Sequence, residues 1–425
     1  MKGHLLSLAL SSARNRRFSL SVTVIALALS VLLMLSVERL RSEARSSFMQ
    51  SVSGTDLIVG PRSSPVQLML YAVFRLGSAN NTLSWKSLQM VRSRADVAFA
   101  IPLSLGDSHD GFAVLGTDLT YFEHFRFGNR QALSFAQGTR FADTLDGLFE
   151  AVVGTEVAQH DNLSLGSQIE LNHGGGNSAH AQHDERPFSV VGILAATGTP
   201  VDRTVHVSLA AIEALHVDWV GGARMPGLKL PADQLRKFDL QPKMISAALV
   251  GLTSRSSVFA MQRALNTYEG EPLTAVMPAL ALDELWKMLA VLENTLRLVS
   301  MLVFAVSVLG LVAIMLATLN ERRREMAILR SVGASPGSIF MLLAIEAFAV
   351  VVLASVVGVG LLYMAVVLAA PLIAERFGVL LRPQLLSPAE WLMLAAILLV
   401  GLAASIAPAT RAYRLSLADG LSPRL

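Results

Sequence analysis

Residues 321–340 read ERRREMAILRSVGASPGSIF and lie between two apolar stretches of the chain. Three consecutive arginines stand near the start of this segment, at 322–324, and its first half is rich in strong helix formers. Gly333 suits the left-handed position that follows a helix. Ser335 and Pro336 suit the cap and the first position of the next helix. The sequence therefore predicts a short basic helix, a sharp turn and a second helix.

Long apolar runs on both sides of this segment, and two more elsewhere, predict membrane spans. About 20 apolar residues are needed for a helix to cross the ~30 Å hydrocarbon layer. We assign four transmembrane helices, at 18–37, 298–319, 338–370 and 391–410. A cleaved signal peptide is the alternative for the first run, but that run is longer than the ~7–15 apolar residues expected of one. The alternative is therefore disfavoured.

The basic residues predict how these spans are oriented. Arginines cluster before the first span, between the second and third spans, and after the fourth span. Because basic residues are enriched in cytoplasmic segments, we place 1–17, 320–337 and 411–425 in the cytoplasm. The region 38–297 and the short loop 371–390 then lie outside. Both termini of the chain are predicted to be cytoplasmic.

The region 38–297 is too long for a loop and predicts an α+β domain. Runs of β-branched residues bounded by glycine and polar residues are typical of strands. The runs lie at 55–60, 111–118, 149–157, 167–172, 188–194, 203–209 and 245–252. A helical pattern lies among them at 257–270. The predicted fold is thus four transmembrane helices with a large extracytoplasmic α+β domain between the first two.

Helical stalks are predicted at both edges of this domain. An apolar seam recurs at three- and four-residue spacing and leads into the second span: Leu282, Leu285, Leu289, Leu292 and Leu296. A similar pattern from Val37 to Phe48 extends the first span outward. Such helices either carry motion between domain and membrane or pack on the domain. The amphipathic segment 65–77 is interpreted as domain core, with a membrane-surface helix as the alternative.

Composition and motifs argue against an enzyme. The chain of 425 residues is 53% hydrophobic and 16% charged, has a net charge of +3 and contains no cysteine. It has no G-x-x-x-x-G-K-[ST], no H-E-x-x-H and no G-x-S-x-G motif. We predict no catalytic residues and no nucleotide bound by this chain. Nucleic-acid binding is disfavoured because the membrane topology already accounts for the arginines.

A histidine-rich stretch is the one candidate metal site in the sequence. Residues 172–187 read NHGGGNSAHAQHDERP and place His173, His180 and His183 close together. Imidazoles with neighbouring carboxylates suit zinc. The same stretch is also typical of a polar hairpin loop between two strands. Both interpretations stay open.

A family resemblance rests on residues 320–347, NERRREMAILRSVGASPGSIFMLLAIEA. This stretch resembles the signature of the FtsX-like permeases, which has the form E-x-A-x-L-x-x-x-G-A. Here the matching residues are Glu325, Ala327, Leu329, Gly333 and Ala334. The external region, with VVGTEVA at 152–158 and FSVVGIL at 188–194, resembles the MacB-type periplasmic core domain. The histidine-rich stretch is not part of the family pattern.

The resemblance implies a permease of the ABC class whose ATPase lies on a separate chain, as in the LolC- and LolE-like permeases. It places the chain in the bacterial inner membrane and implies two permease chains, identical or different, with two ATP-binding subunits that carry ATP and Mg²⁺. The ATPase would dock on the short cytoplasmic helix and drive the external domain through the stalks. The residues that this implies for coupling are Glu321, Arg322, Arg323, Arg324, Glu325, Met326, Leu329, Arg330, Gly333 and Ala334.

Work done outside the membrane would then act on lipoproteins, exported peptides or drugs, or on a periplasmic partner. Two other functions stay open. The chain could be a regulatory scaffold that activates a periplasmic hydrolase and moves no substrate. It could also belong to a metal-linked ABC system in which the histidine-rich loop senses or hands over zinc.

Overall fold

The computed structural model of the protein describes residues 17–414 with short gaps. The gaps are 52, 78–80, 174–185, 218, 221–222, 225–231, 236–237, 322–327, 329, 332 and 378–383. The chain divides into two compact units, and each is described by itself. The helical unit comprises Met1–Glu43, Ala290–Leu372 and Leu381–Leu425, and the external domain comprises Ala44–Leu289 and Ile373–Leu380.

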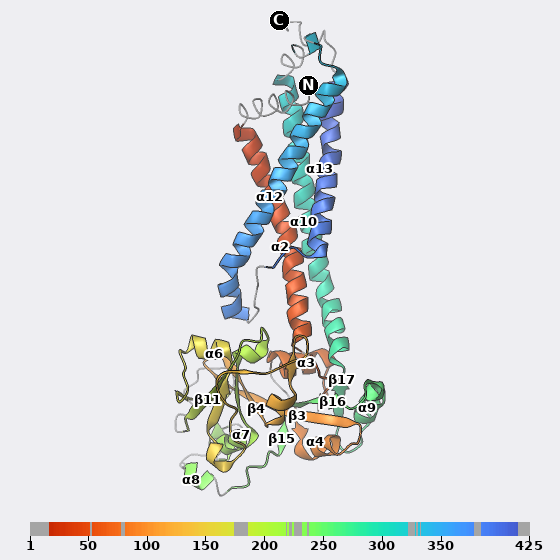
Figure 1. Ribbon diagram of the computed structural model, residues 1–425. Coiled ribbons are helices and arrows are strands. Elements are labelled where there is room, and N and C mark those ends of the chain that lie inside the picture. The colour runs from red at the N-terminus through yellow and green to blue at the C-terminus, as the bar shows by residue number, and fades with distance from the viewer. Residues whose placement is uncertain are drawn as a thin grey trace. The chain divides into compact units, whose positions relative to one another are not determined.

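Four long helices run through the helical unit, and all four are long and apolar enough to cross a membrane. They are α2 (Arg17–Gln50), α10 (Pro278–Glu321), α12 (Pro336–Phe377) and α13 (Pro388–Arg414). Within the unit they lie side by side (Figure 1). Each predicted span falls inside one of them. Pro408 lies within α13, which continues beyond it.

Small residues let these helices approach one another closely. The buried core of the unit takes apolar side chains from all four helices, among them Leu27, Phe304, Val351 and Ile397. A Cβ atom built on Gly358 of α12 would lie 2.9 Å from the carbonyl oxygen of Ala28 in α2. Glycine at such a contact permits the close packing typical of helices in membranes.

The external domain is built on one mixed sheet of 11 strands (Figure 1). Its strands are β1 (Leu57–Pro61), β3 (Val97–His109), β4 (Phe112–Thr117), β7 (Phe135–Gly138), β8 (Glu150–Val153), β9 (Gln168–Ile169), β10 (Asn172–His173), β11 (Phe188–Leu194), β12 (Thr204–Ser208), β16 (Ala247–Leu252) and β17 (Leu273–Val276). The main path runs β17-β1-β16-β3-β4-β12-β8-β11-β7, with β10 beside β3 and β9 beside β11. The pairs β4–β12 and β8–β11 are parallel and the other pairs are antiparallel.

Strand β3 is the longest strand of the sheet and links its two halves. Its first part pairs with β16 and its second part with β4. Pro102 lies in the first part, before the pairing with β4 begins at Ser104. Proline has no N–H to donate to a ladder, and Pro102 is paired with Ala248 of β16 but lies outside the pairing with β4.

Short ribbons and helices complete the described part of the domain. The two-stranded ribbons pair β2 (Leu83–Ser84) with β15 (Met244–Ile245), β5 (Arg126–Phe127) with β6 (Gln131–Ala132), and β13 (Trp219–Val220) with β14 (Ala223–Arg224). The α-helices are α3 (Pro65–Phe74), α4 (Trp85–Arg92), α5 (Thr120–His124), α6 (Thr155–His160), α7 (Leu209–His216), α8 (Ala232–Leu235) and α9 (Val258–Asn266). Turns of 3-10 helix lie at Leu145–Gly147, Pro200–Arg203 and Arg255–Ser257.

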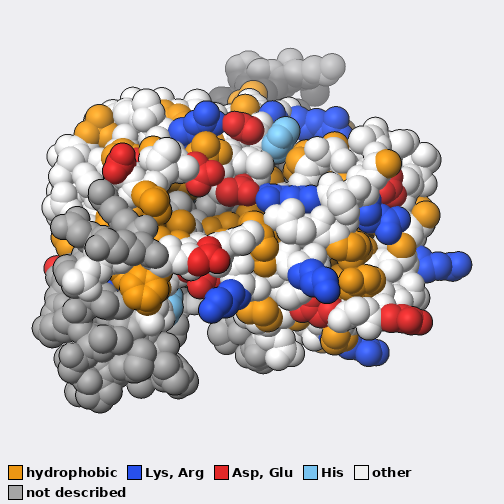
Figure 2. Space-filling model, turned by 90° about the horizontal axis from the view of Figure 1, so that it is seen from below, with side chains coloured by type: hydrophobic (Ala, Val, Ile, Leu, Met, Phe, Trp, Pro, Cys, Tyr) orange, Lys and Arg blue, Asp and Glu red, His pale blue; other side chains and the backbone are white. Residues whose placement is uncertain are grey.

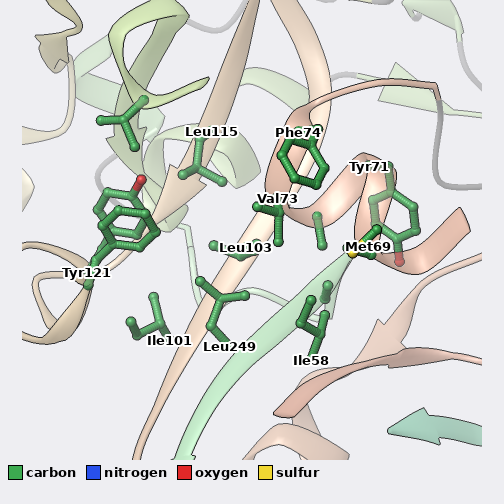
Figure 3. Packing of buried hydrophobic residues seen from close by; sticks show 14 of the residues in the cluster. Ile58, Met69, Tyr71, Val73, Phe74, Ile101, Leu103, Leu115, Tyr121 and Leu249 are labelled. Atoms are coloured by element: carbon green, nitrogen blue, oxygen red, sulfur yellow. The ribbon is translucent and has the colours of Figure 1, made fainter. Parts of the chain in front are cut away.

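Helix α3 packs in the core of the external domain. Seven of its ten residues are buried. Figure 3 shows Met69 and Val73 of this helix turned toward Ile58, Leu103 and Leu249 of the sheet. The helix is therefore domain core, as predicted, and its seven buried side chains are not available to a membrane surface.

Candidate functional site

A buried ion pair joins the first and fourth helices of the helical unit. The Nη1 atom of Arg39 in α2 lies 3.1 Å from Oε2 of Glu390 in α13, and both side chains are buried. The guanidinium also donates to the carbonyl oxygen of Gln384 at 2.8 Å and faces Glu43 one turn along α2 at 3.5 Å. Several partners for both charges are what a buried pair needs, because desolvation of each ion is costly.

Glu390 also caps its own helix, which begins at Pro388. Its Oε2 atom accepts from the backbone N–H of Ser387 at 2.6 Å, and the Ser387 hydroxyl accepts from the N–H of Glu390 at 3.3 Å. This reciprocal pair is a capping box of the form S-x-x-E. One carboxylate therefore fixes the start of α13 and holds α2 beside it.

A second set of charges joins α2 to α10 in the same unit. Glu38 accepts from Arg297 of α10 at 3.2 Å and from Arg41 at 3.0 Å. Arg41 in turn faces Glu293 of α10 at 3.8 Å. We call the seven residues Glu38, Arg39, Arg41, Glu43, Glu293, Arg297 and Glu390 the charge clamp. It ties α2, α10 and α13 together just beyond the apolar part of the first span.

No pattern in the sequence predicts the charge clamp. Arg39 and Glu390 stand 351 positions apart, and no short motif connects them. The available signals were the capping box at Ser387 and the charges that follow the run 18–37. Each signal indicates a charged residue at the end of a span, but neither predicts which residue pairs with that charge.

The outer ends of α2 and α10 belong to the external domain and pack into its core. The ring of Phe48, near the end of α2, lies 4.3 Å from that of Phe74 and 5.7 Å from that of Trp286, measured between centroids. Leu282 of α10 is buried in the same cluster, and Leu285 packs against it.

The remaining leucines of the predicted stalk seam have a different environment. Leu289, Leu292 and Leu296 are exposed within this chain. Of the five stalk leucines, the first two are thus covered by the domain. The other three present an apolar edge on α10.

The predicted turn between the second and third spans has the expected backbone. Gly333 has φ of 101°, and its N–H donates to the carbonyl oxygen of Arg330 at 3.0 Å. The Ser335 hydroxyl accepts from the N–H of Ser338 at 3.2 Å, and Ser338 is the third residue of the helix that Pro336 begins. The left-handed glycine, the cap and the proline are where the sequence predicts them.

Most of the predicted coupling residues lie outside the described part of the chain. These are Arg322, Arg323, Arg324, Glu325, Met326 and Leu329. Glu321 is the last residue of α10, and Arg330, Gly333 and Ala334 are described. Ile328, within the same segment, is exposed. The coupling role of the segment stays a prediction.

The predicted histidine-rich metal site also falls largely outside the described residues. His180 and His183 lie in the undescribed segment 174–185. Only the backbone of His173 is placed, in β10, where it pairs with Asp107 of β3. The interpretation of this stretch as a zinc site stays a prediction.

The core of the external domain contains a buried polar group. His206 of β12 is fully buried, and its Nδ1 atom lies 3.2 Å from the carbonyl oxygen of Val152. Burial, assisted by the positive charge of Arg75, lowers the pKa of His206 to about 3. Burial also raises the pKa of Tyr121 to about 12 and lowers that of Arg75. His206 is therefore a neutral core residue at physiological pH.

These features define a multi-pass membrane protein with one large domain between its first two apolar helices. Two family models match the chain. The model of the MacB-like periplasmic core domain matches residues 19–267, and that of the FtsX-like permease C-terminal domain matches residues 297–417. The chain belongs to the FtsX-like permeases that carry a MacB-like periplasmic core domain, a family of ABC transporter permeases.

Solved structures similar to this chain include two external domains of such proteins. The periplasmic region of MacB from Actinobacillus actinomycetemcomitans is 11% identical, with a TM-score of 0.33, and the match covers 56% of this chain and 94% of that one. The extracellular domain of the noncanonic ABC-type transporter YknZ from Gram-positive bacteria is 15% identical, with a TM-score of 0.30, covering 52% and 98%. No curated protein matches the sequence significantly.

Proposed function

We propose that this chain is the permease subunit of an ABC-type transporter of the mechanotransmission class. In this proposal a separate cytoplasmic ATPase drives movement of the external domain, and the chain itself catalyses no reaction. The observation that carries the proposal is the continuity of α2 and α10. Each runs unbroken from a candidate span into the core of the external domain.

Continuous helices suit the transmission of force because their backbone hydrogen bonds resist bending. The charge clamp supports this role, since Arg39–Glu390 and Glu38–Arg297 join three helices within the helical unit. A displacement of α10 at the level of Arg297 would act on α2, and through Arg39 on α13. The helices would then move as a set.

The segment between α10 and α12 is the proposed docking site of the ATPase. It is short, because α10 ends at Glu321 and α12 begins at Pro336. Under the predicted topology it lies in the cytoplasm with both termini. Its apolar residues Met326 and Leu329 stand among arginines, which suits a partner with an apolar groove and an acidic rim.

The expected assembly has two permease chains and two ATP-binding subunits in the bacterial inner membrane. Its substrates would be handled outside the membrane, as lipoproteins, exported peptides or drugs, or as a periplasmic partner to be controlled. We propose that the exposed leucines at 289, 292 and 296 on α10 contact a second permease chain.

Purification of the full chain from its own host tests the docking site. Met326→Asp together with Leu329→Asp places two carboxylates on the proposed contact face. We expect loss of the co-purifying ATPase, identified by mass spectrometry and by ATP hydrolysis, with normal membrane insertion. Ser331→Asp, at an exposed residue of the same segment, is the matched control and should keep the ATPase. Equal ATPase retention in the double variant and the control would eliminate this docking site.

A further inference from the structure

A second group of potential metal ligands lies in the described part of the external domain. His109, Asp110 and Asp161 each offer a ligand atom, and these atoms lie within 4.8 Å of one another. His109 ends β3 and Asp110 begins the turn to β4, whereas Asp161 follows α6. We propose that these three residues bind a divalent transition-metal ion, with Zn²⁺ as the best match.

The hydrogen bonds of His109 leave one ring nitrogen aimed at Asp161. Its Nδ1 atom lies 2.7 Å from the carbonyl oxygen of Glu170, an atom that can only accept, so Nδ1 must carry a proton. In a neutral ring, Nε2 then carries no proton and presents a lone pair. This Nε2 atom is buried and lies 3.3 Å from Oδ2 of Asp161, and neither atom has a hydrogen bond.

Two lone pairs that face each other at 3.3 Å require a positive charge between them. Either the ring takes a second proton, or a cation bridges the two atoms. The separation itself suits the cation. Two ligands bound at about 2.0–2.2 Å to a tetrahedral zinc ion lie roughly 3.4 Å apart.

Hydrogen bonds from surrounding residues orient His109 and Asp161, as is usual for metal ligands. The bond from Nδ1 to the Glu170 carbonyl fixes the ring and its tautomer, as is usual for a metal-bound histidine. His160 lies 2.6 Å, through Nδ1, from the other carboxylate oxygen of Asp161, and so holds that group in place. His109 is 7% exposed, so its ring is held by packing as well.

Asp110 supplies the third ligand from an exposed turn. Asp110 and Gly111 have φ of 45° and 86°, the two left-handed residues of a tight hairpin turn. The turn fixes Asp110 directly beside His109 while its side chain stays in solvent. A site with one histidine, two carboxylates and an open position for water would bind zinc reversibly. It would exchange the ion with the solution outside the membrane.

Zinc binding by the full chain in detergent tests this site. His173, His180 and His183 are first replaced by glutamine, so that the histidine-rich stretch cannot contribute. After treatment with EDTA, this parent protein should take up one equivalent of Zn²⁺ in competition with a chromogenic chelator. His109→Gln and, separately, Asp161→Asn should each lose that equivalent. His124→Gln, at a histidine stacked on Phe99, is the control and should retain it.

The thermal unfolding temperature gives a second readout. Zn²⁺ should raise it in the parent protein and in the His124 control, and should leave it unchanged in the His109 and Asp161 variants. Without metal, all four proteins should unfold alike, which shows that the variants are folded. If the parent protein binds no zinc, His109 and Asp161 form a protonated ion pair only. Equal zinc uptake by parent and His109→Gln would also overturn the proposal.

Discussion

The helical unit and the external domain have similar apolar cores but opposite surfaces. In the helical unit, large apolar side chains such as Val306, Leu309 and Leu399 are exposed. Charged residues such as Arg39 and Glu390 are buried and paired. In contrast, Figure 2 looks onto the external domain from below, and on that face acidic and basic side chains are interspersed with apolar ones.

The difference follows from the solvent that each unit meets. Apolar side chains on the outside of a helix are stable where that outside is hydrocarbon, and charges are then stable only when paired or near an interface. In a domain surrounded by water, charges lie on the surface and apolar groups pack inside. The same kinds of residue are therefore stable in opposite places in the two units, and three sets of substitutions test this contrast.

The largest effect is expected where a buried charge loses its partner. Arg39→Met leaves the Glu390 carboxylate buried without its main counter-ion, and should lower the free energy of unfolding by about 3–5 kcal/mol. Glu390→Gln keeps the capping box but leaves the Arg39 guanidinium without this counter-ion. It should therefore cost a similar amount. The double variant should cost clearly less than the two single costs added together. Denaturation of the detergent-solubilised chain with SDS measures all three, and strictly additive costs would show that the pair is not coupled.

A matched pair of exposed apolar residues gives the next largest contrast. Leu309 in α10 and Phe259 in α9 are 67% and 70% exposed. Leu309→Arg should disfavour membrane insertion by about 2.5–3.5 kcal/mol, since arginine near the middle of a span meets hydrocarbon. Phe259→Arg should change the stability of the domain by less than about 0.5 kcal/mol. A membrane-integration assay and thermal unfolding measure the two, and equal tolerance at both sites would contradict a membrane-facing α10.

The effect that is smallest near neutral pH concerns acid sensitivity of the external domain. The folded state holds the pKa of His206 at about 3, below its ordinary value of 6.5. The unfolded chain therefore binds this proton more readily, and stability should fall as pH drops from about 6.5 towards 3, by up to about 1.4 kcal/mol per pH unit. His206→Gln removes the titrating group. Urea unfolding at several pH values should give a shallower acid slope for the variant, and identical slopes would exclude His206 as the source.

The sequence predicted helices and strands better than it predicted which residues contact one another in the fold. The run 188–194 coincides with β11, and the charge-free runs lie within the four long helices. Local signals suffice there, because hydrophobic patterning and length decide helix or strand. Strand β3 was missed because Pro102 and Gly106 interrupt its pattern, although its pairing with two neighbouring strands overrides both.

Residues that meet only after folding could not be predicted. Arg39 and Glu390 of the charge clamp come from opposite ends of the chain. His109 ends a strand and Asp161 follows a helix, and strands β4, β7 and β8 lie between them in the sequence. Neither pair follows a spacing rule, since their proximity is set by sheet order and helix packing. The histidine-rich stretch drew attention through composition alone, whereas the structure brings a different histidine against a carboxylate.

Movement of the external domain in response to ATP is the most direct test of the proposed function. The chain has no cysteine, so Glu269→Cys in the domain and Thr410→Cys in α13 give two unique labelling sites. Spin-label distances are measured in the complex with its ATPase, with and without a non-hydrolysable ATP analogue. The nucleotide should shift the distance distribution. Ala290→Pro, which breaks α10 between the two units, should abolish that shift, whereas Ala290→Ser should preserve it. An unchanged distribution in the unbroken chain, or an equal shift in the proline variant, would contradict transmission through α10.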